Sequence, residues 1–176
     1  MIPQKQQSTQ EDWSEAVRLA YESPNIALAE RLVEQGIHEI RKLEHRFGDL
    51  TLSWSGGKDS QALRYVAEAA GIESSVLVIS EVEWPAFLQW ATDNMPWNLT
   101  IIQRPIGLDY LKTRPEMVFP DGKNAARWFS TIQHRGQRQY MKSRKADSEC
   151  LIMGRRRKDG NFISRDDNNF YYDRQG

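Results

Sequence analysis

The sequence predicts an α/β fold, a doubly wound parallel sheet preceded by a helical extension. Residues 50–54 alternate apolar and polar side chains, as a half-buried strand does, and an amphipathic helix pattern follows at 62–70. Apolar runs of strand length recur at 76–79, 99–102 and 151–153, with helical patterns between them. Strands and helices that alternate at this spacing form a parallel sheet with right-handed crossovers.

The first predicted helix belongs to an extension over residues 1–47, and the α/β domain spans 48–176. This helix begins with Ser23 as its cap and Pro24 in its first turn, and Gly48 ends it. Its apolar stripe is expected to pack on the core and consists of Ile26, Ala29, Val33, Ile37, Ile40 and Phe47.

Two more helices are expected within the α/β domain. One begins near Trp84-Pro85 and turns Phe87, Leu88 and Ala91 inward. The other is long and basic and covers 124–146. Its core-facing residues are Trp128, Phe129, Ile132 and Tyr140.

The segment Ser-Gly-Gly-Lys-Asp-Ser at 55–60 lies between the first strand and its helix. The paired glycines permit positive φ and let an anion approach main-chain N–H groups at the positive end of the helix. Lys58 adds a mobile charge, Asp59 caps the helix or holds Mg²⁺ through water, and Ser60 caps the helix or donates to a phosphate. The pattern predicts a phosphate site, with a structural tight turn as the alternative. Its spacing fits neither the Walker nor the dinucleotide pattern.

Two further segments, Ser80-Glu81 and Gly154-Arg155, each follow a predicted strand directly. They should border the same crevice as this loop, at the carboxyl edge of the sheet. Arg155 and Arg156 come after the last strand and can grip a phosphate or sulfate with paired hydrogen bonds. The apolar surface around Ile79 suits an adenine ring. The predicted nucleotide-binding residues are Ser53, Ser55, Gly56, Gly57, Lys58, Asp59, Ser60, Ile79, Ser80, Gly154, Arg155 and Arg156.

Residues 55–60 resemble the PP-loop of the adenine nucleotide α-hydrolase-like superfamily. Residues 151–161 (Leu-Ile-Met-Gly-Arg-Arg-Arg-Lys-Asp-Gly-Asn) resemble the second motif of its phosphoadenylyl-sulfate (PAPS) reductase-like branch. The resemblance covers about residues 48–170 and implies a Rossmann-like domain that binds ATP, PAPS or adenylyl sulfate. Members either adenylate a substrate from ATP or bind a sulfonucleotide for reduction. Lys58, Asp59 and Arg155 are the residues expected to act on the phosphates, with Mg²⁺ on Asp59 if ATP is used.

The sequence departs from the reductases of that family at its single cysteine. Their nucleophile lies in a C-terminal Glu-Cys-Gly-Leu-His segment, whereas Cys150 precedes the apolar residues of a predicted strand and is expected to be a small core residue. Thiol-dependent reduction by this chain alone, an iron–sulfur cluster and a zinc site are therefore not expected. The chain also lacks the Pro- and Trp-containing continuation of these relatives, so either the domain is minimal or a second copy or a partner subunit completes it.

Charge is unevenly placed along a chain of zero net charge. Residues 1–100 hold 8 Lys and Arg against 15 Asp and Glu, a net −7, while residues 101–176 hold 16 against 9, a net +7. The basic half suits an anionic ligand or nucleic acid, and the alternatives are a solvated surface of uneven charge or a contact between subunits. An accessory protein that binds nucleotide or nucleic acid is therefore the alternative to an enzyme. No membrane-length apolar run or signal peptide is evident, so a cytoplasmic location is expected.

Overall fold

The computed structural model describes residues 9–118, 128, 130–144 and 149–154. In this part of the chain the protein is an α/β structure with one all-parallel sheet in the order β3-β2-β1-β4, consistent with a Rossmann-like fold. The strand predictions are confirmed to within a few residues. The four strands are β1 (Asp49–Ser53), β2 (Ser75–Ser80), β3 (Leu99–Arg104) and β4 (Glu149–Met153).

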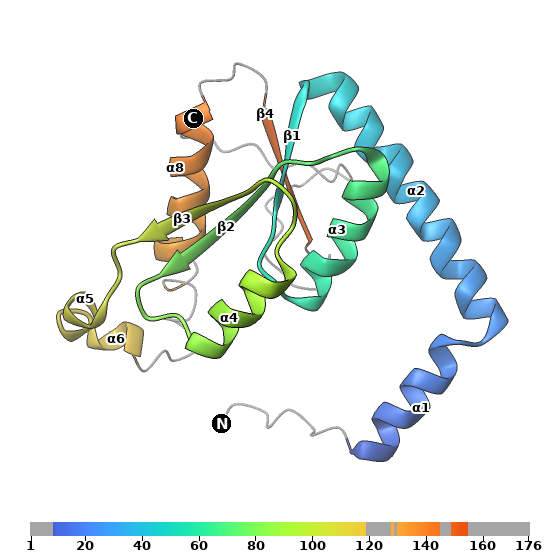
Figure 1. Cartoon of the computed structure of the whole chain (residues 1–176), viewed down its shortest axis with the longest axis horizontal. Helices are drawn as coiled ribbons and strands as arrows, with labels where there is room; N and C mark the ends of the chain where they lie inside the picture. Colours follow the sequence, from blue (N-terminus) through green and yellow to red (C-terminus); the bar gives the residue numbers. More distant parts are fainter. Residues whose placement is uncertain (1–8, 119–127, 129, 145–148, 155–176) are drawn as a thin grey trace.

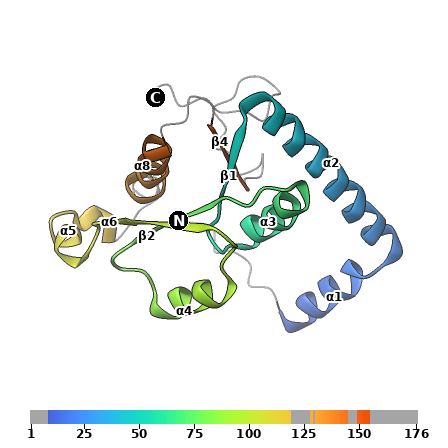
Figure 2. The same cartoon turned by 45° about the horizontal axis from the view of Figure 1, so that its top comes forward.

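Helices cover both faces of the sheet (Figures 1 and 2). One face carries α2, α3 and α4, and the other carries α8, with short helices after β3. No helix in the described ranges combines the length and the apolar composition that a membrane span requires. The helices are α1 (Gln10–Ala20), α2 (Ser23–Phe47), α3 (Lys58–Ala70), α4 (Pro85–Asn94), α5 (Leu108–Lys112), α6 (Pro115–Val118), the π-helical turn η1 (Ser130–His134) and α8 (Arg135–Arg144).

The central strand β1 is covered on both faces. Leu52 and Trp54 point into the apolar cluster beneath α2, α3 and α4. Thr51 faces α8, where its Oγ1 lies 3.2 Å from the Tyr140 hydroxyl. The sequence predicts a half-buried strand from this alternation, but the polar face is covered as well. Thr51 is buried against α8 and Ser53 is half-buried there, and both make hydrogen bonds to α8 side chains.

The helix on the opposite face departs from the single long helix expected at 124–146. In the described part of that segment, Trp128 is helical, and a π-helical turn at Ser130–His134 leads into α8. Ile132 and Tyr140 are buried as predicted, while Phe129 lies outside the described residues. Gly136 lets α8 approach β2 closely, since a Cβ at this position would overlap the side chain of Val78.

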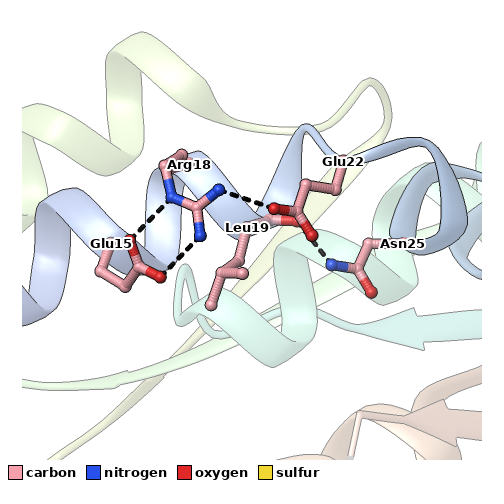
Figure 3. Close-up of polar contacts among 5 residues, drawn as sticks. All are labelled: Glu15, Arg18, Leu19, Glu22 and Asn25. Carbon is pink, nitrogen blue, oxygen red and sulfur yellow. Dashed lines mark hydrogen bonds and ion pairs between the residues drawn. The ribbon is translucent and has the colours of Figure 1, made fainter.

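The α1 helix, which the sequence reading missed, forms an arm with the first half of α2 (Figure 1). A local signal marks its start, because Thr9 and Asp12 form a capping box. The elbow between the two helices is held by polar contacts (Figure 3): Arg18 makes two hydrogen bonds of 2.8 Å to Glu15 and one of 2.7 Å to Glu22, and Asn25 Nδ2 donates to the Leu19 carbonyl at 2.5 Å. None of the α1 residues is buried.

Only the second half of α2 belongs to the core. Ile40 is buried with Leu50 and Leu52, whereas Ile26 is exposed, so the predicted stripe packs on the core only toward its end. The predicted cap at Ser23 is also wrong, because Glu22 is the N-cap and its side chain makes no capping hydrogen bond to the helix. At Gly36 the helix crosses α3 so closely that a Cβ would lie 2.8 Å from Val66 Cγ1.

Deletion of residues 1–21 is expected to shift Tm by less than about 4 °C, because exposed ion pairs contribute little to stability. Ile40→Ala in the full chain should instead lower the free energy of unfolding by about 2–5 kcal/mol, because it leaves a cavity in the core. Thermal and urea unfolding followed by circular dichroism measure both. A large loss of stability on deletion would show that the arm supports the fold.

Candidate functional site

The glycine loop connects β1 to α3 at the carboxyl edge of the sheet. Gly56 has φ of +71°, the left-handed region that favours glycine. Gly57 is the N-cap of α3 and has φ of −70°, which any residue adopts. The expectation that the glycine pair serves positive φ therefore holds for Gly56 alone.

Ser60 fastens this loop to the first turn of α3. Its Oγ accepts from the Ser55 amide at 3.3 Å and donates to the Gly57 carbonyl at 2.9 Å, and the Ser55 hydroxyl lies within 3.2 Å of the same oxygen. Ser60 is buried. The prediction that Ser60 or Asp59 caps the helix is wrong, because Gly57 occupies that position and no side chain caps it.

The amino end of α3 is accessible from the side of Gly57. The N–H groups of a first helical turn have no acceptor within the helix, and they carry its positive dipole end. Gly57 is exposed, and a Cβ there would meet nothing closer than the Ser55 hydroxyl at 3.5 Å. Neither the backbone conformation nor the packing requires glycine at this position. Because Gly57 has no side chain, the space beside the first turn of α3 is open to a ligand.

Lys58 and Asp59 are the first two residues of α3. Lys58 Nζ lies 2.5 Å from Asp59 Oδ1, and the Lys58 side chain is 74% exposed. The ammonium group thus lies at the exposed start of α3, beside the glycine loop. There it can exchange the carboxylate of Asp59 for a more highly charged anion. Within the described ranges no group of three or more His, Cys, Asp and Glu residues is placed to hold a metal ion.

The end of β4 meets the start of α3. Ser53 is level with Met153 in the sheet, so Trp54 and Gly154 are the first residues beyond the two strands. A Cβ on Gly154 would lie 2.8 Å from the Asp59 carbonyl oxygen and 3.3 Å from the Ser60 nitrogen. The segments that carry the two sequence motifs are therefore in contact where the strand order reverses, which is the ligand position in open α/β sheets. Arg155 and Arg156 lie outside the described residues.

Three other predicted residues make contacts of their own. Ser53 accepts a 2.8 Å hydrogen bond from Gln137 Nε2 on α8. The amide and hydroxyl of Ser80 both donate to Glu83 Oε1 at 3.1 Å, which closes the turn between β2 and α4. Ile79 is half-buried and packs against the cluster beneath α4. None of these contacts joins its residue to the loop.

An aromatic wall borders the loop on the side away from β4, and sequence reasoning missed its role. Its two members, Phe87 and Trp90, lie on α4, and a Cβ on Gly56 would be 3.0 Å and 2.8 Å from their rings. Leu88, which the sequence places inward, is exposed instead. Phe87 and Trp90 are three residues apart, so both lie on one face of a helix. This spacing does not tell which other element that face contacts.

Cys150 and the basic group of α8 are two further features that the sequence singles out. Cys150, which the sequence predicts to be a small buried core residue, is half-buried in β4 and packs against the core, and burial raises the pKa of its thiol. A raised pKa lowers the fraction of reactive thiolate at neutral pH. The cations of α8, including Arg135 and Lys142, belong to the opposite face of the sheet from α3 (Figure 2).

Comparison with known proteins assigns neither the fold nor the site to a family. No family model matches this chain, no curated protein matches it, and no solved structure matches it. The site is therefore defined by the glycine loop, the first turn of α3, the end of β4 and the aromatic wall of α4.

Proposed function

We propose that this protein is an adenine nucleotide-binding enzyme of the PP-loop type, similar to PAPS reductases, which acts at the phosphates of ATP or a sulfonucleotide. One contact supports this assignment most directly. Gly154, the residue that precedes the arginine run, approaches the backbone of Asp59 and Ser60 so closely that it excludes a Cβ. A structural turn would account for the glycine loop alone, but not for a second basic motif that begins at the same point.

In this function the phosphates lie over Gly57 and the first turn of α3. Main-chain N–H groups and the helix dipole bind the oxygens, and Lys58 neutralises the charge that develops on them. Arg155 and Arg156 supply further bidentate contacts. Asp59 would hold Mg²⁺ if ATP is the ligand, and the ion would supply stabilisation of the charge on the phosphoryl oxygens.

The chemistry is adenylation or sulfur transfer without a thiol nucleophile from this chain, since the single cysteine is half-buried and has a raised pKa. The attacking group therefore comes from the substrate. The competing function is an accessory protein that binds nucleotide without turnover. Release of pyrophosphate, AMP or sulfite in the presence of candidate acceptors distinguishes the enzyme from the accessory protein.

Lys58→Ala is expected to weaken ATP, AMP, adenylyl sulfate or PAPS binding about 10- to 100-fold, the range of a lost hydrogen bond to a charged group. Titration calorimetry with each nucleotide measures this. Lys112→Ala is the matched control, because its side chain is also 74% exposed and its ammonium pairs with one carboxylate, that of Asp109, at 2.8 Å.

Lys112 lies on α5, which follows the edge strand farthest from β4 (Figure 1). Its replacement should leave nucleotide affinity unchanged. Equal affinities for the wild-type chain and Lys58→Ala would contradict the proposed role of the loop, and so would equal losses in the two variants.

A further inference from the structure

The aromatic wall continues into the core as a stack of three rings. Trp54 and Trp90 have ring centroids 6.1 Å apart and planes inclined by 15°, and Phe87 and Trp90 are 6.4 Å apart at 25°. Trp54 is 1% exposed and Phe87 is half-buried, whereas Trp90 is 38% exposed. Trp90 is therefore the most exposed residue of the stack.

This indole lies directly beside the loop. The Cζ3 and Cη2 atoms of Trp90 are the ring atoms that approach Gly56, at 2.8 Å and 3.6 Å from the position of a Cβ. Gly154 and the end of β4 lie on the other side of the same loop, against the first turn of α3. A ligand whose phosphates occupy the loop thus has an aromatic surface on one side.

The contact with Gly56 alone does not account for a tryptophan at this position. A smaller apolar side chain would fill the space beside a glycine, and it would not expose an indole to water. A partly exposed indole beside an anion site suits a ligand that joins a planar ring to phosphates, because nucleobases stack on aromatic side chains. Ile79 offers less area, since it is half-buried among the residues beneath α4.

We propose that Trp90 binds the base of the nucleotide whose phosphates lie on residues 55–60, and that it selects nucleotides over simple polyphosphates. This role rests on the proposed function. The base packs on the exposed part of the indole, and the phosphates lie over Gly57 at the start of α3. Trp90 then determines affinity for the base, while the loop determines affinity for the phosphates.

The test compares two probes, ATP and inorganic tripolyphosphate, which carries the phosphate chain without a base. Trp90→Leu is expected to lower the affinity for ATP about 5- to 150-fold, the range of one base–aromatic stack, and to change the affinity for tripolyphosphate less than about twofold. ATP should also quench tryptophan fluorescence in the wild-type chain but not in the variant. Trp97→Leu is the control, since Trp97 is exposed and precedes β3 at the amino edge of the sheet.

Equal weakening of both probes would overturn the proposal, because Trp90 would then only support the loop. Unchanged ATP affinity in Trp90→Leu would overturn it as well. If the wild-type chain binds tripolyphosphate as tightly as ATP, the base contact is contradicted and the phosphate site stands. If the wild-type chain binds neither probe, the proposed function itself is contradicted. Should Trp90→Leu fail to fold, Trp90→Phe replaces it, because it keeps an aromatic ring of smaller area. It is expected to bind ATP more weakly than the wild-type chain.

Discussion

Gly56→Ala is expected to lower the free energy of unfolding by about 2–5 kcal/mol, the sum of a left-handed backbone penalty and of overpacking. The residue has φ of +71°, and its missing Cβ would lie 2.8 Å from the Trp90 ring. Relief would require α4 to move away from the loop, because Trp90 is packed on Trp54. Urea unfolding measures the effect as a lower midpoint with an unchanged slope.

The neighbouring Gly57→Ala is the matched variant, and it is expected to change stability little. The backbone at Gly57 suits alanine and its surroundings are open, which favours the variant through a less flexible unfolded chain, but alanine is a poorer helix N-cap than glycine. The two effects oppose each other, so the free energy of unfolding should change by less than about 1 kcal/mol. ATP affinity should nevertheless fall, because the new methyl group covers the surface on which the phosphates are proposed to lie. Unchanged ATP affinity in Gly57→Ala would place the ligand elsewhere.

Gly154→Ala is expected to reduce ATP affinity by about tenfold or more, which corresponds to roughly 1.4 kcal/mol or more of binding free energy. The added methyl group would meet the Asp59 carbonyl oxygen and carbon at 2.8 Å and 3.0 Å. These are main-chain atoms, so either β4 or the first turn of α3 must shift. The free energy of unfolding should also fall, by about 1–3 kcal/mol, as for other overpacked sites.

A control must separate this local effect from a general loss of stability. Gly71→Ala does so, because Gly71 has φ of +98° and no atom within 4 Å of its Cβ position. The substitution strains the C-cap of α3, at the other end of the helix from the loop. Calorimetry should show normal ATP affinity for Gly71→Ala and weak binding for Gly154→Ala. A similar loss of ATP affinity in both variants would mean that reduced stability causes the effect.

The strands and the helix after the glycine loop could be predicted because their signals are local. Continuous apolar residues in β2 and the alternation in β1 both indicate strands, and Gly71 marks the end of α3 in the left-handed conformation. The same local patterns do not report burial. Thr51 is polar and fully buried, whereas Ile26 is apolar and exposed, because each depends on whether another element covers it.

The helical segment at 124–146 shows a second limit. Its sequence pattern predicts one helix, yet a π-helical turn precedes α8 at Ser130–His134. A π turn adds a residue to one turn of a helix and changes which side chains face the sheet. Close packing of Gly136 on Val78 and the hydrogen bond from Gln137 to Ser53 hold α8 in place. These contacts join residues far apart in the chain, so no short window of sequence contains them.

The sequence by itself determined that a glycine loop lies between a strand and a helix in a parallel α/β fold, because side-chain periodicity and turn chemistry act between near neighbours. Only the tertiary structure decided that Gly56 is required by conformation and packing while Gly57 is not. It also decided that Gly154 meets the start of α3 and that Trp90 borders the loop. The reason is physical: strand order and close packing bring these residues together, and both depend on the whole chain folding at once.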